Sequence, residues 1–378
     1  MAKFTFRLPS EGDIRNSRNG GTMLHIIESD YKEKFTVVTG CPGSGKTTVS
    51  IFRLIRLVNN RKPTVLLTYQ TMLKVAIENL LVDQGIPKYK VNTMHSWYWS
   101  VTKKMLGFSH HGDKLNSDQI EKDLKNKNLG QCELILDEAQ DLEERIFQSL
   151  PNVFGRITIG ADNDQQMHPN TGASEHTIKK HLEHSLNEFE LQFNYRNTYH
   201  IYNFARYFVP DSPKVNDANT LSELQRYKNN GDKPEVLKFN SQKEMRDRLK
   251  IIIDNYKSGF NIGILFPYVN QVKEYYDIVQ ELIGDECSMY HSEMTKDQKG
   301  KVEEELKNIL ITTFISAKGM EFDVVIMPEF DSVKAGDKKQ FYVGCTRAKN
   351  RLVLMHTGNK PAVLNNFPTD TYDTGNLF

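Results

Sequence analysis

Short apolar, β-branched segments alternate with longer segments of helical spacing along the first half of the chain. The apolar segments are FTVVT (35–39), PTVLLTY (63–69), ELILD (133–137) and RITIG (156–160). Helical spacing follows the first two of them, in TTVSIFRLIRLV (47–58) and TMLKVAIENLLVD (71–83). Strands that alternate with helices in this way predict an α/β fold with a parallel sheet and helices on both of its faces.

The second half of the chain repeats the pattern after a break. Residues 211–234 are rich in Pro, Asn and Gly, which is typical of a connection. Further strands are predicted in EVLKF (235–239), NIGILF (261–266), ILITTF (309–314), DVVIMP (323–328) and RLVLMH (351–356). We therefore expect two α/β domains, with the following boundaries: an irregular lead-in over 1–20, a first domain over 21–198 with a small helical insertion at about 97–131, a second domain over 199–360, and a loosely ordered tail over 361–378.

The stretch GCPGSGKT (40–47) fits the phosphate-binding loop G-x-x-x-x-G-K-[ST] at every fixed position, between a predicted strand and a predicted helix. Its glycines let backbone N–H groups turn toward phosphates, and the helix N-terminus adds a favourable dipole. Lys46 is placed to reach the β- and γ-phosphates and Thr47 to bind Mg²⁺. The predicted nucleotide-binding residues of this segment are Gly40, Gly43, Ser44, Gly45, Lys46, Thr47 and Thr48.

Acidic and amide side chains follow two other predicted strands of the first domain. Asp137 and Glu138 end one strand, where ligands of doubly wound sheets bind. We expect Asp137 to hold Mg²⁺ or its water and Glu138 to deprotonate the attacking water. Gln165 follows another strand and could contact the γ-phosphate, although a polar turn explains it equally well. Arg196 and Arg347 lie among aromatic and small residues and are candidate arginine fingers, with an ordinary surface arginine as the alternative.

Composition indicates a cellular compartment but does not indicate a binding partner. In 378 residues, 38% are hydrophobic, 26% are charged and the formal net charge is +1, so no global positive field indicates nucleic acid. The four cysteines are scattered, which disfavours a disulfide framework or zinc site and fits a reducing compartment. No signal-peptide core or membrane-length apolar run is present, so we expect a cytoplasmic protein without membrane contact.

Taken in order, the motifs resemble the UvrD/Rep-like superfamily I helicases. The matching segments are GCPGSGKT, LLTYQ, TMHS, LILDEAQD, ADNDQQ, NYRN, TTFISAKGMEFDVV and FYVGCTRAK, from about residue 36 to residue 356. The resemblance implies two RecA-like P-loop NTPase domains with parallel sheets and an ATP site in the cleft between them. It also implies the cofactors ATP and Mg²⁺.

The resemblance assigns further roles by position. It makes Asp137 a Mg²⁺ ligand, Glu138 the catalytic base, Gln165 the γ-phosphate sensor, and Arg196 and Arg347 contacts to the γ-phosphate. Tyr195 corresponds to the tyrosine that stacks on adenine and Glu321 to the acid near the ribose. The residues that fall where relatives touch single-stranded DNA are Tyr69, Thr93, His95 and Ser96; for Tyr69, burial in the core is an equal alternative. We expect Trp97 and Trp99 to pack rather than bind.

This chain departs from the family pattern at several positions. It has no Gln before Gln70 to read the adenine edge, which leaves preference for ATP over GTP open. His168 and Asn170 stand where relatives typically place aromatic residues that stack on bases. The insertion after Trp97 is small, whereas relatives insert large accessory subdomains that contact duplex DNA.

Two hypotheses of different classes follow from these residues. The first is an ATP-dependent helicase or single-stranded DNA translocase, 3′→5′ by resemblance, with RNA as an alternative track. A protein partner would supply duplex contacts or a second activity. The second is an ATP-gated regulatory subunit of a protein complex, in which the same ATPase switches a partner and unwinding is weak or absent.

Overall fold

The computed structural model describes residues 3–4, 6–30, 33–107, 115–166, 171–227, 230–332 and 338–375. Its contacts divide the chain into two compact units. The phosphate-loop unit runs from Arg7 to Phe193, and the second unit runs from Asn194 onward and also takes in the described residues before Arg7. The division therefore falls between Phe193 and Asn194, whereas the sequence placed it after residue 198.

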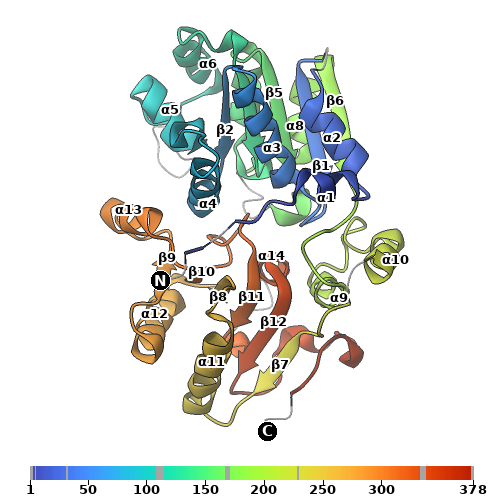
Figure 1. Cartoon of the computed structure of the whole chain (residues 1–378), viewed down its shortest axis with the longest axis vertical. Helices are drawn as coiled ribbons and strands as arrows, with labels where there is room; N and C mark the ends of the chain where they lie inside the picture. The colour runs from blue at the N-terminus through green and yellow to red at the C-terminus, as the bar shows by residue number, and fades with distance from the viewer. Residues whose placement is uncertain are drawn as a thin grey trace. The chain divides into compact units, whose positions relative to one another are not determined.

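Six parallel strands form the sheet of the phosphate-loop unit, in the order β3-β2-β4-β5-β1-β6 (Figure 1). The strands are β1 (Phe35–Gly40), β2 (Thr64–Thr68), β3 (Val91–Thr93), β4 (Glu133–Asp137), β5 (Arg156–Ala161) and β6 (Leu186–Leu191). The α-helices are α1 (Glu11–Arg15), α2 (Gly20–Glu28), α3 (Lys46–Asn59), α4 (Thr71–Val82), α5 (Met94–Thr102), α6 (Ser117–Lys125), α7 (Glu144–Ser149) and α8 (Glu175–Leu182).

The second unit also has a six-stranded parallel sheet, in the order β7-β12-β11-β8-β10-β9. Its strands are β7 (Glu235–Lys238), β8 (Ile262–Phe266), β9 (Cys287–Tyr290), β10 (Ile309–Thr313), β11 (Phe322–Met327) and β12 (Ala348–His356). The α-helices are α9 (Tyr199–Ala205), α10 (Ala218–Tyr227), α11 (Gln242–Tyr256), α12 (Val269–Ile283), α13 (Lys296–Glu304) and α14 (Lys338–Cys345). The predicted fold class, two α/β domains with parallel sheets, is confirmed.

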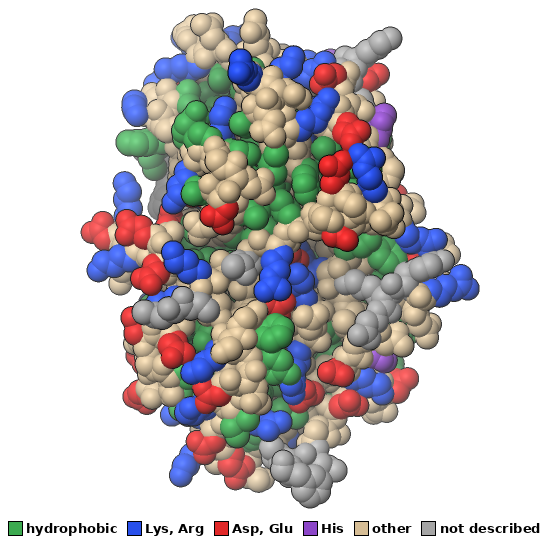
Figure 2. Space-filling model, viewed as in Figure 1, with side chains coloured by type: hydrophobic (Ala, Val, Ile, Leu, Met, Phe, Trp, Pro, Cys, Tyr) green, Lys and Arg blue, Asp and Glu red, His purple; other side chains and the backbone are tan. Residues whose placement is uncertain are grey.

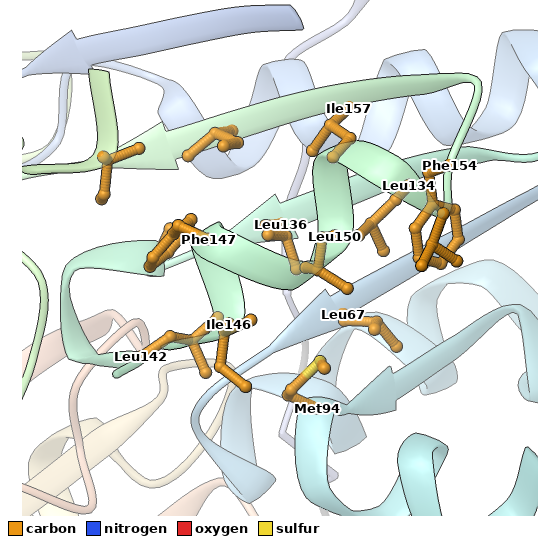
Figure 3. Close-up of a cluster of buried hydrophobic side chains, with 14 of the residues drawn as sticks. Leu67, Met94, Leu134, Leu136, Leu142, Ile146, Phe147, Leu150, Phe154 and Ile157 are labelled. Carbon is orange, nitrogen blue, oxygen red and sulfur yellow. The ribbon is translucent and has the colours of Figure 1, made fainter. Parts of the chain in front are cut away.

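Both faces of the first sheet are covered by apolar side chains because successive residues of a strand point to opposite faces. On β1, Val37 belongs to the larger core and Val38 packs with residues of α1, α2 and α3. Figure 3 shows part of the larger core, in which Phe147 and Leu150 lie against Leu134 and Leu136 of β4. The two cores hold the strands so that their carboxyl ends form one edge.

A buried ion pair connects the elements behind the phosphate loop. The guanidinium group of Arg53 on α3 pairs with the Glu133 carboxylate at the start of β4. The same group donates to the Ile26 carbonyl at 2.6 Å and the Ser29 carbonyl at 3.1 Å, at the end of α2. The Thr158 hydroxyl donates to Glu133 at 2.9 Å. Helix α2 is thereby fixed to α3 and to the sheet.

Replacing Arg53 by alanine is expected to lower the free energy of unfolding by about 3–5 kcal/mol, because the Glu133 carboxylate would stay buried without its partner. Arg53 and Glu133 are only 1% and 5% exposed. Urea unfolding monitored by circular dichroism measures the change. Lys125→Ala, which removes an exposed ion pair with Glu121 on α6, is the control, with an expected change of about 0.5 kcal/mol or less. Similar losses for the two variants would contradict this role.

The two ends of the chain are more ordered than their sequences predicted. Within the predicted lead-in, α1 forms with a capping box between Ser10 and Asp13. In the predicted loose tail, Phe367 is buried with its ring centroid 4.8 Å from that of Phe208. The N–H of Val236 on β7 donates to the Asp373 carbonyl at 2.8 Å. The expectation was wrong because these segments are too short for a period to show and depend on contacts distant in sequence.

Three strands were not predicted: β3, β6 and β9. All three are edge strands of their sheets. β3 has only three residues, and β6, with the sequence LNEFEL, carries acidic side chains that a hydrophobic pattern does not detect.

Among the residues that the structure describes, no helix is both long and apolar enough to cross a bilayer. Figure 2 shows basic and acidic side chains interspersed on the viewed face of the protein.

Candidate functional site

The phosphate loop connects β1 to α3, as the sequence predicted. Gly45 is the N-cap of α3 with φ 101°, a conformation that favours glycine. A β-carbon there would also lie 3.0 Å from the Met23 methyl group of α2. The Lys46 ammonium donates to the carbonyls of Gly40 and Cys41 at 2.7 and 3.0 Å. It also pairs with the Asp162 carboxylate at 3.3 Å. Protein oxygens therefore surround the lysine that is expected to bind phosphate.

The structure brings together the two predicted Mg²⁺ ligands. The Thr47 hydroxyl donates to Oδ2 of Asp137 at 2.8 Å. On the neighbouring strand β5, Gly160 leaves room for this carboxylate, because a β-carbon there would lie 2.9 Å from Oδ1 of Asp137. Burial raises the pKa of Asp137, and the nearby Glu138 raises it further, while Thr47 and Lys46 act in the opposite direction. A hydroxyl and a carboxylate at one point are the oxygen ligands that Mg²⁺ prefers, so these residues fit the ion.

Glu138 directly follows β4 in a left-handed conformation, with φ 56°. This conformation is costly for a residue with a side chain and occurs mainly where the surroundings enforce it. The carboxylate is nearly buried and accepts a hydrogen bond from Nε2 of Gln140 at 2.6 Å. The predicted base is thus held at the carboxyl end of the sheet, next to the Thr47–Asp137 pair in sequence.

Gln165 and Asp162 lie beside the phosphate loop. Nε2 of Gln165 donates to Oδ2 of Asp162 at 2.7 Å, and this same oxygen accepts from Lys46. Both side chains are buried, at 2% and 0% exposure. The predicted γ-phosphate sensor is therefore linked to the predicted phosphate-binding lysine through a carboxylate. Asp162 had been given no role from the sequence, where it stands only as part of ADNDQQ.

Arg196 and Glu321, both in the second unit, form an ion pair at 2.9 Å. The Arg196 guanidinium also donates to the Thr346 carbonyl at 3.3 Å. Burial raises the pKa of Glu321, but Arg196, Lys349 and Arg347 outweigh it, so the net shift is downward. Glu321 is thus ionised at neutral pH. Tyr195 directly precedes Arg196 and is partly buried.

Arg347 is fully buried in this structure. Its Nε donates to the Val343 carbonyl at 3.0 Å, and its terminal nitrogens reach the Met320 carbonyl at 3.4 Å and the Thr346 hydroxyl at 3.3 Å. The guanidinium therefore connects the end of α14 to the segment that carries Glu321. The alternative of an ordinary surface arginine is excluded for Arg347.

The predicted nucleic-acid contacts lie at or just after the ends of β2 and β3, two neighbouring strands of the phosphate-loop unit. Tyr69 packs partly against the core, and its ring lies edge-on to His95 with centroids 6.4 Å apart. The Thr93 hydroxyl accepts from the Ser96 N–H at 3.3 Å and so caps α5. Thr93 is buried, whereas Ser96 is exposed. As the N-cap of α5, Thr93 has a structural role. Both interpretations of Tyr69, packing in the core and contact with nucleic acid, stay open.

The pKa of His95 is lowered to about 4, because its imidazole is removed from water and lies near Arg145, with Glu143 opposing the shift. The neutral form is therefore favoured in the folded state, while the unfolded chain takes up a proton near pH 6.5. His95 is expected to contribute a decrease in the free energy of unfolding as the pH drops from about 6.5 to 4, whereas Asp137, whose pKa is raised, contributes in the opposite direction. Unfolding of the wild type and of His95→Gln at a series of pH values measures the His95 contribution as the difference between the two, and the wild type should lose more stability on acidification in that window. An unchanged dependence in His95→Gln would rule out this contribution.

The two tryptophans near α5 differ from each other. Trp97 is buried with its ring centroid 5.8 Å from that of Phe154, as expected. Trp99 is 49% exposed, with the Lys103 ammonium 4.9 Å from its ring centroid, so the prediction that it packs was wrong. The reason is that residues two apart on a helix point to nearly opposite faces. His168 and Asn170 lie outside the described residues.

Three residues of the site were not predicted from the sequence: Asn19, Gln140 and Asp162. Nδ2 of Asn19 donates to the carbonyls of Ser44 and Phe193, both at 3.3 Å, and so joins the phosphate loop to the segment before NYRN. Ser44 is buried, whereas Gly43 and Thr48 are partly exposed. Gln140 and Asp162 follow predicted strands, in the segments DEAQD and ADNDQQ, and this position is the sequence feature that could have identified them. Nothing local marked Asn19.

Comparisons with known proteins agree with this geometry. The family model described as an AAA domain matches residues 24–172, and the model described as a UvrD-like helicase C-terminal domain matches residues 267–359. The RecBCD enzyme subunit RecB of Chlamydia pneumoniae is 35% identical over 65 residues, which is 16% of this chain and 6% of that protein's length.

Among solved structures, the C-terminal domain of a possible DNA helicase from Lactobacillus plantarum WCFS1 is similar with 18% identity and a TM-score of 0.35. The similarity covers 48% of this chain and 98% of that one. The two family models lie in the two units described above. With the motif order and the two parallel sheets, they show that the chain belongs to the UvrD/Rep-like superfamily I helicases.

Proposed function

We propose that this protein hydrolyses ATP to move along single-stranded DNA, in the 3′→5′ direction, as a translocase or helicase. The observation that carries the proposal is the arrangement at the end of β4, where Thr47 and Asp137 meet and Glu138 follows. This arrangement supports a Mg²⁺ site and a catalytic base beside the phosphate loop. A protein that only bound nucleotide would not need a buried carboxylate beside the metal ligands.

In this mechanism the loop N–H groups and Lys46 bind the phosphates. Lys46 exchanges the carbonyls of Gly40 and Cys41 and the Asp162 carboxylate for phosphate oxygens. Thr47 and Asp137 would hold Mg²⁺, which would neutralise phosphate charge. Glu138 takes a proton from the attacking water. Gln165, once its Asp162 contact is released, orients toward the γ-phosphate, and Arg196 and Arg347 stabilise the transferring group.

Contacts with single-stranded DNA are proposed for Tyr69, His95 and Ser96. An aromatic face stacks on any base, and a neutral imidazole can add a polar contact without sequence preference. Thr93 contributes by fixing the start of α5, on which His95 and Ser96 lie. The proposed partner is therefore single-stranded nucleic acid, with a protein partner supplying contacts to duplex.

A regulatory subunit that uses the same ATPase to switch a protein partner is the second candidate. The observation that favours it is that three large apolar or aromatic side chains between residues 89 and 105 of the phosphate-loop unit are exposed. Tyr89 is 72%, Trp99 49% and Met105 69% exposed. Exposed aromatic and methionine side chains are typical of protein interfaces.

Steady-state ATP hydrolysis with and without single-stranded DNA tests the proposal, with RNA and GTP in parallel assays. Stimulation of about tenfold or more by DNA, lost in Glu138→Gln, supports a nucleic-acid motor. A rate that neither DNA nor RNA changes overturns the stand-alone motor and favours the regulatory subunit. A higher rate with RNA than with DNA would replace DNA as the track.

A further inference from the structure

The side chain of Gln140 is completely buried between two loops of the candidate site. Its Nε2 donates to the Glu138 carboxylate at 2.6 Å. Its Oε1 accepts from the Asp162 N–H at 3.0 Å, and its backbone carbonyl accepts from Nε2 of Gln166 at 3.1 Å. One amide side chain therefore contacts both the loop after β4 and the loop after β5.

This contact extends to the phosphate loop. Asp162, whose N–H is held by Gln140, accepts hydrogen bonds from Lys46 and Gln165 through one carboxylate oxygen. A continuous series of hydrogen bonds thus runs from Lys46 through Asp162 and Gln140 to Glu138. Any displacement of the Asp162 backbone when a phosphate binds Lys46 would act on the side chain that holds Glu138.

Glutamine is suited to this place by its chemistry. The position needs one acceptor for an N–H and one donor for a carboxylate, on a planar group of fixed geometry. A glutamate would keep the acceptor but turn a second carboxylate toward Glu138. An apolar side chain of similar length would leave both partners without this hydrogen bond in a buried setting.

We propose that Gln140 is the positioning residue that holds Glu138 in place for proton abstraction and makes its position depend on the Asp162 loop. This rests on the proposed function, in which Glu138 is the base. In this proposal Gln140, which is fully buried, acts through Glu138 and not on the nucleotide. Its loss should therefore change the rate of hydrolysis and leave nucleotide affinity almost unchanged.

Gln140→Glu and Gln140→Met test the proposal, with Gln166→Ala as the control that loses a contact to Gln140 but none to Glu138. We expect kcat for ATP hydrolysis to fall about 10- to 100-fold in both Gln140 variants. The dissociation constant of a fluorescent ADP analogue should change by about twofold or less, and the control should hydrolyse ATP at a rate within about twofold of the wild type. A near-normal kcat for Gln140→Glu would overturn the proposal, because holding Asp162 alone would then suffice.

A measurement that does not depend on activity covers the case of poor folding. The double variant E138Q/Q140E exchanges donor and acceptor across the same contact. It should restore most of the stability that Gln140→Glu loses, as judged by thermal unfolding, and no recovery would contradict the contact. Full hydrolysis in Glu138→Gln would instead reject the proposed base, whatever the Gln140 variants do.

Discussion

Replacing Arg347 by alanine is expected to lower ATP hydrolysis by about 10³- to 10⁵-fold, the range found when an arginine finger is removed. Charge on the transferring phosphoryl group is stabilised by a cation at short range. Among side chains, only the arginine guanidinium presents its N–H donors in a rigid, planar fork. Steady-state hydrolysis at saturating ATP measures the loss. Affinity for a fluorescent ADP analogue should be retained, because the phosphate loop lies in the other unit.

Complete burial of Arg347 requires a control for folding. Its removal also takes one hydrogen-bond donor from each of the Val343 and Met320 carbonyls. Arg347→Lys keeps the charge and should still lose most of the activity. Arg351→Ala, on β12 four residues after Arg347, removes a partly buried pair with Glu235 of β7 and should lower stability with a far smaller change in rate. If Arg347→Ala unfolds and Arg347→Lys hydrolyses normally, the residue is structural.

Glu138→Gln is expected to lower kcat by about 10²- to 10⁴-fold while nucleotide affinity is kept or increased, because the amide cannot accept the proton of the attacking water. The substitution preserves shape, so the left-handed turn after β4 and the contact to Gln140 can both persist. Single-turnover hydrolysis, which separates the chemical step from product release, measures the effect.

Glu144→Gln is the matched control for this variant. Glu144 is exposed on α7, a short distance along the chain, and pairs with His181 at 2.8 Å. Its loss should leave hydrolysis within about twofold of the wild type. An equal loss in both variants would point to a general charge effect, and full activity in Glu138→Gln would assign the base to another residue.

Interior strands and motif positions could be predicted from the sequence alone. The β-branched segments of β1, β2, β4 and β5 are buried on both faces, so their composition is distinctive. The carboxyl ends of parallel strands meet at one edge, which is why the motif positions alone predict that Thr47, Asp137 and Glu138 lie near each other.

Side-chain partners could not be predicted in this way. The sequence names Gln140 and Asp162 among the residues after two strands, but only the adjacency of β4 and β5 makes one accept a hydrogen bond from the other. The same holds for Arg196 and Glu321, which are distant in sequence and form an ion pair in the second unit.

Helix faces and chain ends show most clearly which features the sequence predicts and which depend on tertiary contacts. Trp97 and Trp99 have the same chemistry, and the direction of α5 alone decides that one is buried and the other exposed. Phe367 is buried because its ring packs against those of Phe204 and Phe208. The sequence by itself determined the phosphate loop, the interior strands and the family. The tertiary structure decided which polar groups form hydrogen bonds and ion pairs with each other, because these depend on distances of a few ångströms between segments far apart along the chain.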